Sequence, residues 1–178
     1  MENKTYEMIR KIAITGPEST GKSMLAQQLA DHYHTLWVPE FARDYLTSLN
    51  RPYEEDDILY IARQQLQKEK ASAAMAKDRL FCDTELIVTK IWSEVKYGRC
   101  HPWILQQIER HRYDLYLLCD IDLPWEFDPL REHPGKRKFL FDRYHRELSE
   151  RGFRFAVIRG NGRIRTENAI RIVENFGF

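Results

Sequence analysis

Eight consecutive residues near the N-terminus carry the clearest chemical signal in this sequence. Residues 16–23 read GPESTGKS, which fits the pattern G-x-x-x-x-G-K-[ST]. The two glycines let the backbone curl so that N–H groups point at a phosphate oxygen, and the following helix adds its positive dipole end. Lys22 would bring a mobile charge to the β- and γ-phosphates, and Ser23 would offer its hydroxyl to Mg²⁺. The sequence therefore predicts a phosphate loop for ATP and magnesium, with contacts from Gly16, Glu18, Ser19, Thr20, Gly21, Lys22 and Ser23.

Two carboxylates end apolar runs further along the chain. Asp83 follows the run at 80–82, and a carboxylate in that position commonly holds Mg²⁺ through water, because the ion keeps much of its hydration shell. Asp83 could instead cap a helix that starts at Thr84. Glu40 ends another run and could orient an acceptor hydroxyl for in-line attack, or it could compensate a helix dipole. Which of Glu40 and Asp83 acts as the base stays open.

The elements that must position these residues follow from the apolar pattern. Five short apolar runs read as strands, at 11–15, 36–39, 80–83, 115–120 and 153–159. Segments with helical spacing lie between or after them, around 25–33, 58–74, 140–148 and 169–176. This alternation predicts a three-layer α/β/α fold with a parallel sheet and right-handed crossovers. Ligands then bind at the carboxyl ends of the strands, where the phosphate loop, Glu40 and Asp83 all lie.

Length and composition exclude several other classes of protein. The chain has 178 residues, 43% hydrophobic and 31% charged, which is the size and composition of one soluble domain spanning 1–178. A net charge of +1 argues against a nucleic-acid binder, and three widely spaced cysteines suggest no zinc site. No apolar run is long enough to span a membrane, so a cytoplasmic location is expected. Residues 131–165 hold 11 basic and 4 acidic residues, which would suit a phosphate or a solvated helix face.

Five motifs together give the chain a family resemblance. They are GPESTGKS at 16–23, VPEFAR at 38–43, DT at 83–84, YDLYLL at 113–118 and DLPW at 122–125. In this order they resemble the NadR-type ribosylnicotinamide kinases, from about residue 10 to residue 170. The resemblance implies a fold like the nucleoside monophosphate kinases, with strand order 2-3-1-4-5 and a lid segment at about 126–140. It also implies transfer of phosphate from ATP to the 5′-hydroxyl of nicotinamide riboside, which gives nicotinamide mononucleotide for NAD salvage.

Two residues depart from the family pattern. Glu85 stands where a second Asp is expected, and Pro129 stands where Gly is more frequent. The Pro129 difference could stiffen the entry to the lid segment or change substrate contacts.

A pyridinium substrate adds expectations about the acceptor site. A Trp face is the best side-chain partner for a cation, and Trp125 is favoured over Trp92 and Trp103 because it follows the fourth strand. A buried core position is the alternative for each of them. The other expected substrate contacts are Glu40, Arg43, Asp122 and Asp128.

The remaining expected contacts concern the phosphates and the adenine. Arg131 and Arg137 are expected to close over the phosphates, and Asn161 and Arg163 to wrap the adenine, although GNG at 160–162 could equally be a plain turn. The fused nucleotidyltransferase and DNA-binding domains of some relatives are not expected here, and the oligomeric state is left open. Two other functions remain possible: a kinase for another nucleoside or small alcohol, and a regulatory ATPase without an acceptor.

Overall fold

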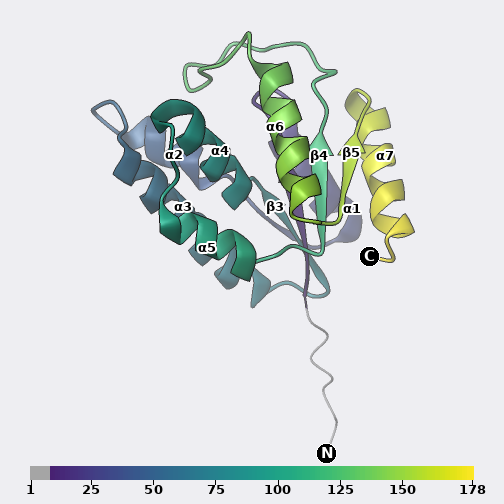
Figure 1. Ribbon diagram of the computed structural model, residues 1–178. Coiled ribbons are helices and arrows are strands. Elements are labelled where there is room, and N and C mark those ends of the chain that lie inside the picture. Colours follow the sequence, from purple (N-terminus) through teal and green to yellow (C-terminus); the bar gives the residue numbers. More distant parts are fainter. Residues whose placement is uncertain (1–8) are drawn as a thin grey trace, which may run out of the picture.

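Five short strands form one parallel sheet at the centre of the molecule (Figure 1). The computed structural model describes residues 9–178. The strand order is β2-β3-β1-β4-β5 and every neighbouring pair is parallel. The predicted fold class and the order 2-3-1-4-5 are therefore confirmed. The strands are β1 (Arg10–Thr15), β2 (Leu36–Val38), β3 (Arg79–Asp83), β4 (Leu115–Cys119) and β5 (Phe155–Ile158).

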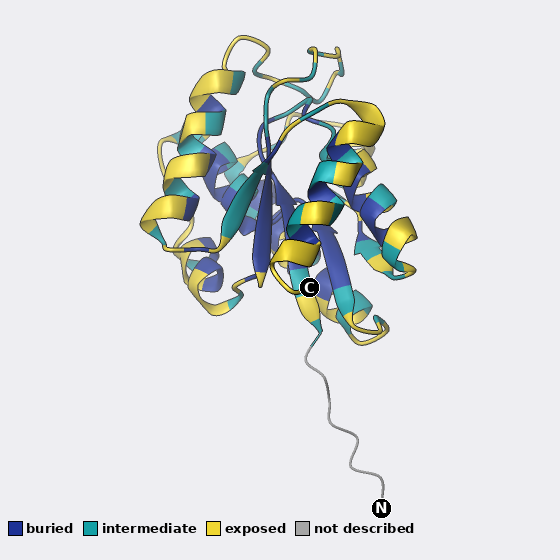
Figure 2. Cartoon of the chain, turned by 90° about the vertical axis from the view of Figure 1, so that its right-hand side faces the viewer, coloured by how far each residue is buried: buried dark blue, intermediate teal, exposed yellow. Residues whose placement is uncertain are grey.

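Six of the seven helices in the described part of the chain cover the two faces of this sheet, and α2 packs on α3 through Phe41, Tyr45 and Tyr60. Ile12 and Ile14 of β1 point toward α1 and α7, where they pack with Leu29 and Val173. Ala13 points to the opposite face, which α3, α4, α5 and α6 cover. Figure 2 shows the resulting buried sheet between helices that are exposed on their outer sides. The helices are α1 (Lys22–Tyr33), α2 (Phe41–Ser48), α3 (Glu55–Ala73), α4 (Leu86–Tyr97), α5 (Pro102–Arg110), α6 (Arg137–Glu150) and α7 (Gly162–Asn175).

Three of these helices were not predicted from helical spacing, each for a physical reason. The helices α2 and α5 have 8 and 9 residues, too few for a periodic pattern to stand out. The helix α4 buries residues on most of its circumference, including the polar Thr89, Lys90 and Ser93, so it shows no single apolar stripe.

The carboxyl ends of the strands meet at one edge of the sheet, as the topology requires (Figure 1). The phosphate loop follows β1, Glu40 follows β2, and Asp83 is the last residue of β3. After β4, residues 120–136 form no helix or strand, and residues 137–140 are the first turn of α6. The lid segment expected at 126–140 is therefore a loop that ends in a helix. Among residues 9–178, no helix combines the length and the apolar character needed to cross a membrane.

Candidate active site

The phosphate loop is shaped by two glycines that no other residue could replace without strain. Gly16 has a φ of 129°, and a Cβ atom there would lie 2.9 Å from the carbonyl oxygen of Cys119 in β4. Gly21 has a φ of 74° and precedes α1 without a side-chain cap, so the first N–H groups of α1 stay available for an anion. The Lys22 ammonium donates to the Pro17 carbonyl oxygen at 2.7 Å. The Thr20 hydroxyl donates to the same oxygen at 2.8 Å, which closes the loop.

Asp83 ends β3, which is paired with β1, and Glu40 follows β2, the next strand beyond β3. Burial raises the pKa of the Glu40 carboxyl, the Lys22 ammonium lowers it, and the charge of Asp83 raises it further. Asp83 is almost fully buried, and burial raises the pKa of its carboxyl, while the Ser23 hydroxyl and the Lys22 charge oppose that shift. Both carboxylates therefore lie close enough to Lys22 for its charge to lower their pKa.

The structure decides one of the alternatives that the sequence left open. The helix α4 begins at Leu86, and its cap is Glu85, whose carboxylate accepts the Ile87 N–H at 2.6 Å. The second oxygen of Glu85 accepts the Thr15 hydroxyl at 2.8 Å. The interpretation of Asp83 as a helix cap is therefore wrong, because Glu85 already fills that position.

Asp83 and Ser23 fit a magnesium ion. Within residues 9–178, the Oδ1 atom of Asp83 is a buried oxygen without a hydrogen-bond partner, and such an oxygen needs a ligand. No group of three or more His, Cys, Asp or Glu side chains gathers in the described chain as a metal cage would. Mg²⁺ commonly uses one or two protein oxygens together with water and substrate phosphates, which suits this donor pair.

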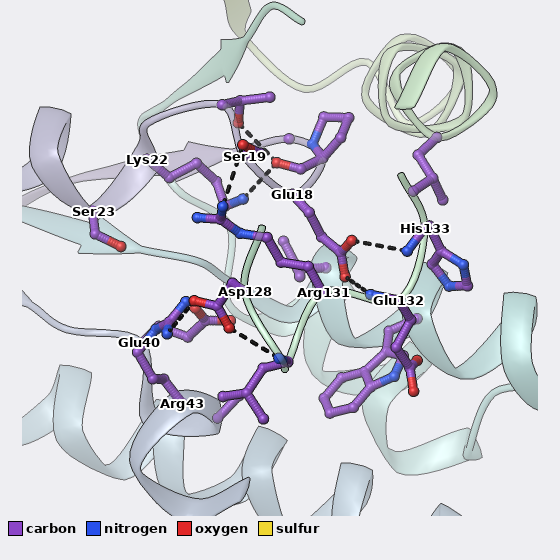
Figure 3. A pocket seen from close by; sticks show the side chains of 18 of the residues that line it. Glu18, Ser19, Lys22, Ser23, Glu40, Arg43, Asp128, Arg131, Glu132 and His133 are labelled. Carbon is purple, nitrogen blue, oxygen red and sulfur yellow. Dashed lines mark hydrogen bonds and ion pairs between the residues drawn. The ribbon is translucent and has the colours of Figure 1, made fainter. Parts of the chain in front are cut away.

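A cavity of about 1170 Å³ extends from the phosphate loop to α4 and the lid segment (Figure 3). The whole phosphate loop and Glu40 line it. Six further residues predicted for the site or next to it also line the cavity: Arg43, Trp92, Glu126, Asp128, Arg131 and Asn161. The Arg43 guanidinium pairs with Asp128 at 2.8 Å, so this pair joins α2 to the lid segment across the cavity.

Five predicted site residues lie outside the cavity lining: the buried Asp83, and Trp125, Arg137, Asp122 and Arg163. Trp125 lies beneath the guanidinium groups of Arg131 and Arg137, each 5.9 Å from its ring centre. Arg137 donates to the carbonyl oxygens of Ser19 at 3.2 Å and Leu123 at 2.8 Å. The structure therefore gives Trp125 two cations of the chain itself, and it gives Arg137 a role in holding the loop.

Asp122 and Arg163 are the other two, and both contact α7. Asp122 accepts the Gly160 N–H at 2.6 Å and pairs with Arg165 at 2.7 Å. Arg163 has a 91% exposed side chain that pairs with Glu167. Neither side chain reaches the space beside the phosphate loop, so the structure gives no support to their predicted ligand contacts.

Arg165 is a residue that the sequence interpretation missed. Its side chain is buried, and it donates to the Asp122 carboxylate and to three carbonyl oxygens, those of Gly160, Thr20 and Asp120, at 2.7–3.0 Å. It thereby fastens the phosphate loop to the loops that follow β4 and β5. No local signal distinguishes such an arginine from the exposed arginines nearby on α7.

Tyr53 is a second residue that the sequence interpretation missed. Its hydroxyl accepts the Trp92 indole N–H at 2.8 Å and donates to Glu132 at 2.7 Å, and the two rings meet edge to face at 4.9 Å. Tyr53 and Trp92 both line the cavity and together form an aromatic wall of it. Tyr53 lies just before α3, in a turn-like stretch that gave no sign of this contact.

A phosphate loop between the first strand and first helix of a 2-3-1-4-5 sheet defines the P-loop α/β class. A family model described as an AAA domain matches residues 11–165, and the chain belongs to that family. Two trifunctional NAD biosynthesis/regulator proteins NadR, from Salmonella typhimurium and Escherichia coli, are 32% and 33% identical to it over 127 and 129 residues. Each match covers 69% of this chain, which spans 31% of either relative. The predicted resemblance to NadR-type proteins is confirmed.

Solved structures share the fold. A crystal structure of NadR protein in complex with NR matches with a TM-score of 0.77 and 21% identity, over 95% of this chain and 52% of that chain. Thymidylate kinase from Ehrlichia chaffeensis matches with a TM-score of 0.67 and 14% identity, over 93% of this chain and 97% of that chain. At these identities the likeness establishes the fold.

Proposed function

We propose that this chain is an ATP-dependent kinase whose acceptor is the 5′-hydroxyl of nicotinamide riboside, with nicotinamide mononucleotide as the product. The observation that carries the proposal is one continuous cavity that joins Lys22, Glu40 and the aromatic wall of Tyr53 and Trp92. A donor site and an acceptor site thereby open into the same space. The two NadR relatives and a separately solved NadR protein in complex with NR support this choice of acceptor.

The phosphate loop binds the donor in this proposal. The backbone N–H groups of the loop and the Lys22 ammonium hold the phosphates, while Ser23 and Asp83 would hold magnesium. When bound, the magnesium ion neutralises charge on the phosphate oxygens. Asn161, which lines the cavity at the start of α7, is the proposed adenine contact.

Glu40 orients the acceptor hydroxyl. It lines the cavity, and burial raises the pKa of its carboxyl, so the group is a better proton acceptor than an exposed glutamate. Phosphoryl transfer through a loose transition state depends mainly on position and charge, which a fixed carboxylate beside Lys22 provides.

Trp92 faces the base of the acceptor in this proposal. It lines the cavity, whereas Trp125 lies beneath Arg131 and Arg137 outside the lining. A flat aromatic face attracts a cationic pyridinium ring more strongly than a neutral base. The Arg43–Asp128 pair lines the same cavity from α2 and the lid segment.

The test compares acceptors with the purified chain, ATP and Mg²⁺. Release of ADP is measured with nicotinamide riboside, uridine, adenosine or no acceptor, and the product is identified by mass spectrometry. We expect release that depends on nicotinamide riboside and yields nicotinamide mononucleotide. Equal release with every acceptor, or with none, would overturn the proposal.

A pair of lysine variants tests whether turnover depends on the phosphate loop. Lys22→Ala should lower turnover by a factor of roughly 10² or more, since it removes a charge aimed at the transferring group. Lys70→Ala removes an exposed lysine from α3, outside the cavity lining, and should leave turnover unchanged.

A further inference from the structure

Glu18 places a negative charge inside a loop that binds phosphate. It is the third of the eight residues of the phosphate loop, where a carboxylate facing the phosphates would repel them. Its two oxygens instead accept the backbone N–H groups of Glu132 and His133, each at 3.2 Å (Figure 3). One carboxylate thus binds two consecutive amides of the lid segment, 114 and 115 residues away in sequence.

Ser19 continues this contact one residue further. Its hydroxyl oxygen accepts the Glu126 N–H at 2.9 Å and the Arg131 guanidinium at 3.3 Å. Its φ of 56° is a left-handed conformation that costs energy for a residue other than glycine, and these contacts hold it there. Two neighbouring residues of the phosphate loop therefore hold both ends of the stretch 126–133.

These contacts matter because the lid segment up to residue 136 has no regular secondary structure to fix its backbone. Residues 120–136 contain no helix or strand. Arg165 and Arg137 hold the beginning of this stretch, at Asp120, Asp122 and Leu123. Further along, the other side-chain contacts include Arg43 with Asp128, Tyr53 with Glu132, and Arg131 with the Glu126 carbonyl oxygen. Arg131 lines the cavity, and the N–H group that Glu18 binds belongs to the very next residue. Glu18 therefore holds the backbone next to Arg131, whose guanidinium also donates to the Ser19 hydroxyl and the Glu126 carbonyl oxygen.

We propose that Glu18 is a positioning residue: it fastens the lid segment to the phosphate loop so that Arg131 faces the cavity. Glu18 is then not a ligand of the triphosphate, which revises the contact expected from the sequence. The consequence for turnover rests on the proposed function, whereas the position of the lid segment can be tested without any turnover.

Limited trypsin digestion measures how readily the backbone of the lid segment becomes accessible to a protease. Trypsin cleaves after Arg131, where the N–H of the scissile peptide bond is the one that Glu18 binds. Cleavage after Arg99, in the turn between α4 and α5, serves as an internal reference. Glu18→Ala removes both acceptor oxygens, and it should speed cleavage after Arg131 about tenfold relative to cleavage after Arg99, because charge-assisted hydrogen bonds are lost. Glu18→Gln keeps one acceptor and should give an intermediate rate.

Two controls keep this result specific. Glu150→Gln removes the same charge from the exposed C-terminal end of α6, outside the cavity, and should digest like the wild-type chain. Glu18→Asp keeps the charge on a shorter side chain, so cleavage after Arg131 should be slower than in Glu18→Ala. This variant provides the comparison if Glu18→Ala or Glu18→Gln folds poorly. Unchanged cleavage after Arg131 in both Glu18→Ala and Glu18→Gln would overturn the proposal.

Kinetics then separate positioning from phosphate binding. A positioning role predicts that Glu18→Ala lowers kcat about tenfold, because Arg131 is no longer held toward the cavity. The KM for ATP should not rise, because the variant removes a negative charge from the phosphate loop. A higher KM for ATP with unchanged digestion would identify Glu18 as a phosphate-side ligand and overturn the proposal. If the wild-type chain transfers phosphate to no acceptor, the proposed function fails, and the digestion result alone decides the role of Glu18.

Discussion

The contacts of Arg165 predict a large loss of stability when its guanidinium is removed. The side chain is 5% exposed, and Arg165→Met would delete all four of its hydrogen bonds while keeping most of its apolar volume. Breaking a buried ion pair on one side costs about 3–5 kcal/mol. The Asp122 side chain is 34% exposed and would be partly rehydrated, so we expect the low end, about 3 kcal/mol.

Urea unfolding followed by circular dichroism measures this change in the free energy of unfolding. For a chain of 178 residues, about 3 kcal/mol also corresponds to a melting temperature lower by roughly 6–12 °C. Arg165→Lys keeps a point charge that cannot reach all four partners, so it should lose about half as much. Because the Thr20 carbonyl loses its partner, the affinity for ATP should weaken as well.

Arg163→Met is the matched control two residues earlier on α7. Its side chain is 91% exposed and pairs only with Glu167 four residues on, so the variant should cost no more than about 0.5 kcal/mol. The reasoning would be refuted if Arg165→Met unfolded within about 1 kcal/mol of the wild-type chain, or if Arg163→Met cost as much.

Three further predictions concern the cavity and the core. Glu40→Gln should lower kcat about 10²-fold with little change in the affinity for ATP, and an unchanged kcat would exclude a role in orienting the acceptor. Trp92→Ala should raise the KM for the acceptor about tenfold while Trp125→Ala leaves it within about twofold, and the opposite order would contradict the proposed wall. Burial raises the pKa of Glu69 to about 7 from 4.5, so the folded state binds this proton more tightly than the unfolded state. The contribution of Glu69 to the free energy of unfolding is therefore fully present below pH 4.5 and falls by roughly 3 kcal/mol as the pH rises through 7, and Glu85 should contribute a similar slope. In urea titrations at several pH values, Glu69→Gln should remove the slope due to Glu69 and leave that of Glu85. An unchanged slope would show that Glu69 does not titrate in this way.

The sequence alone was sufficient for the phosphate loop and for the class of fold. The loop is a contiguous run in which residue type dictates backbone shape, so its chemistry is legible without any knowledge of tertiary contacts. The strands are short apolar runs because the sheet is covered on both faces, and their alternation with helices constrains the topology. Glu40 and Asp83 could be predicted near the loop for the same reason, since parallel strands end at one edge.

The lid segment and the acceptor end of the cavity could not be predicted in the same way. Trp125 follows β4 as expected, but the direction of its ring depends on Arg131 and Arg137, which pack against it from further along the chain. The pairing of Tyr53 with Trp92 joins residues 39 apart in sequence, through a helix that has no visible period. Such contacts are decided by how loops pack against a finished core.

Glu18 and Arg165 show most clearly what the sequence determines and what tertiary structure decides. From its position, Glu18 belongs to the phosphate loop, yet only the folded chain brings two amides of the lid segment to its carboxylate. From its sequence neighbours, Arg165 is expected on a solvated helix face. The fold instead buries it where three carbonyl oxygens and a carboxylate converge. Residue types fix which groups can bind a phosphate, because that chemistry is local. Tertiary structure decides which charges remain available to bind the phosphate, because a buried charge is stable only when it is paired or hydrogen-bonded with the groups that the fold places around it.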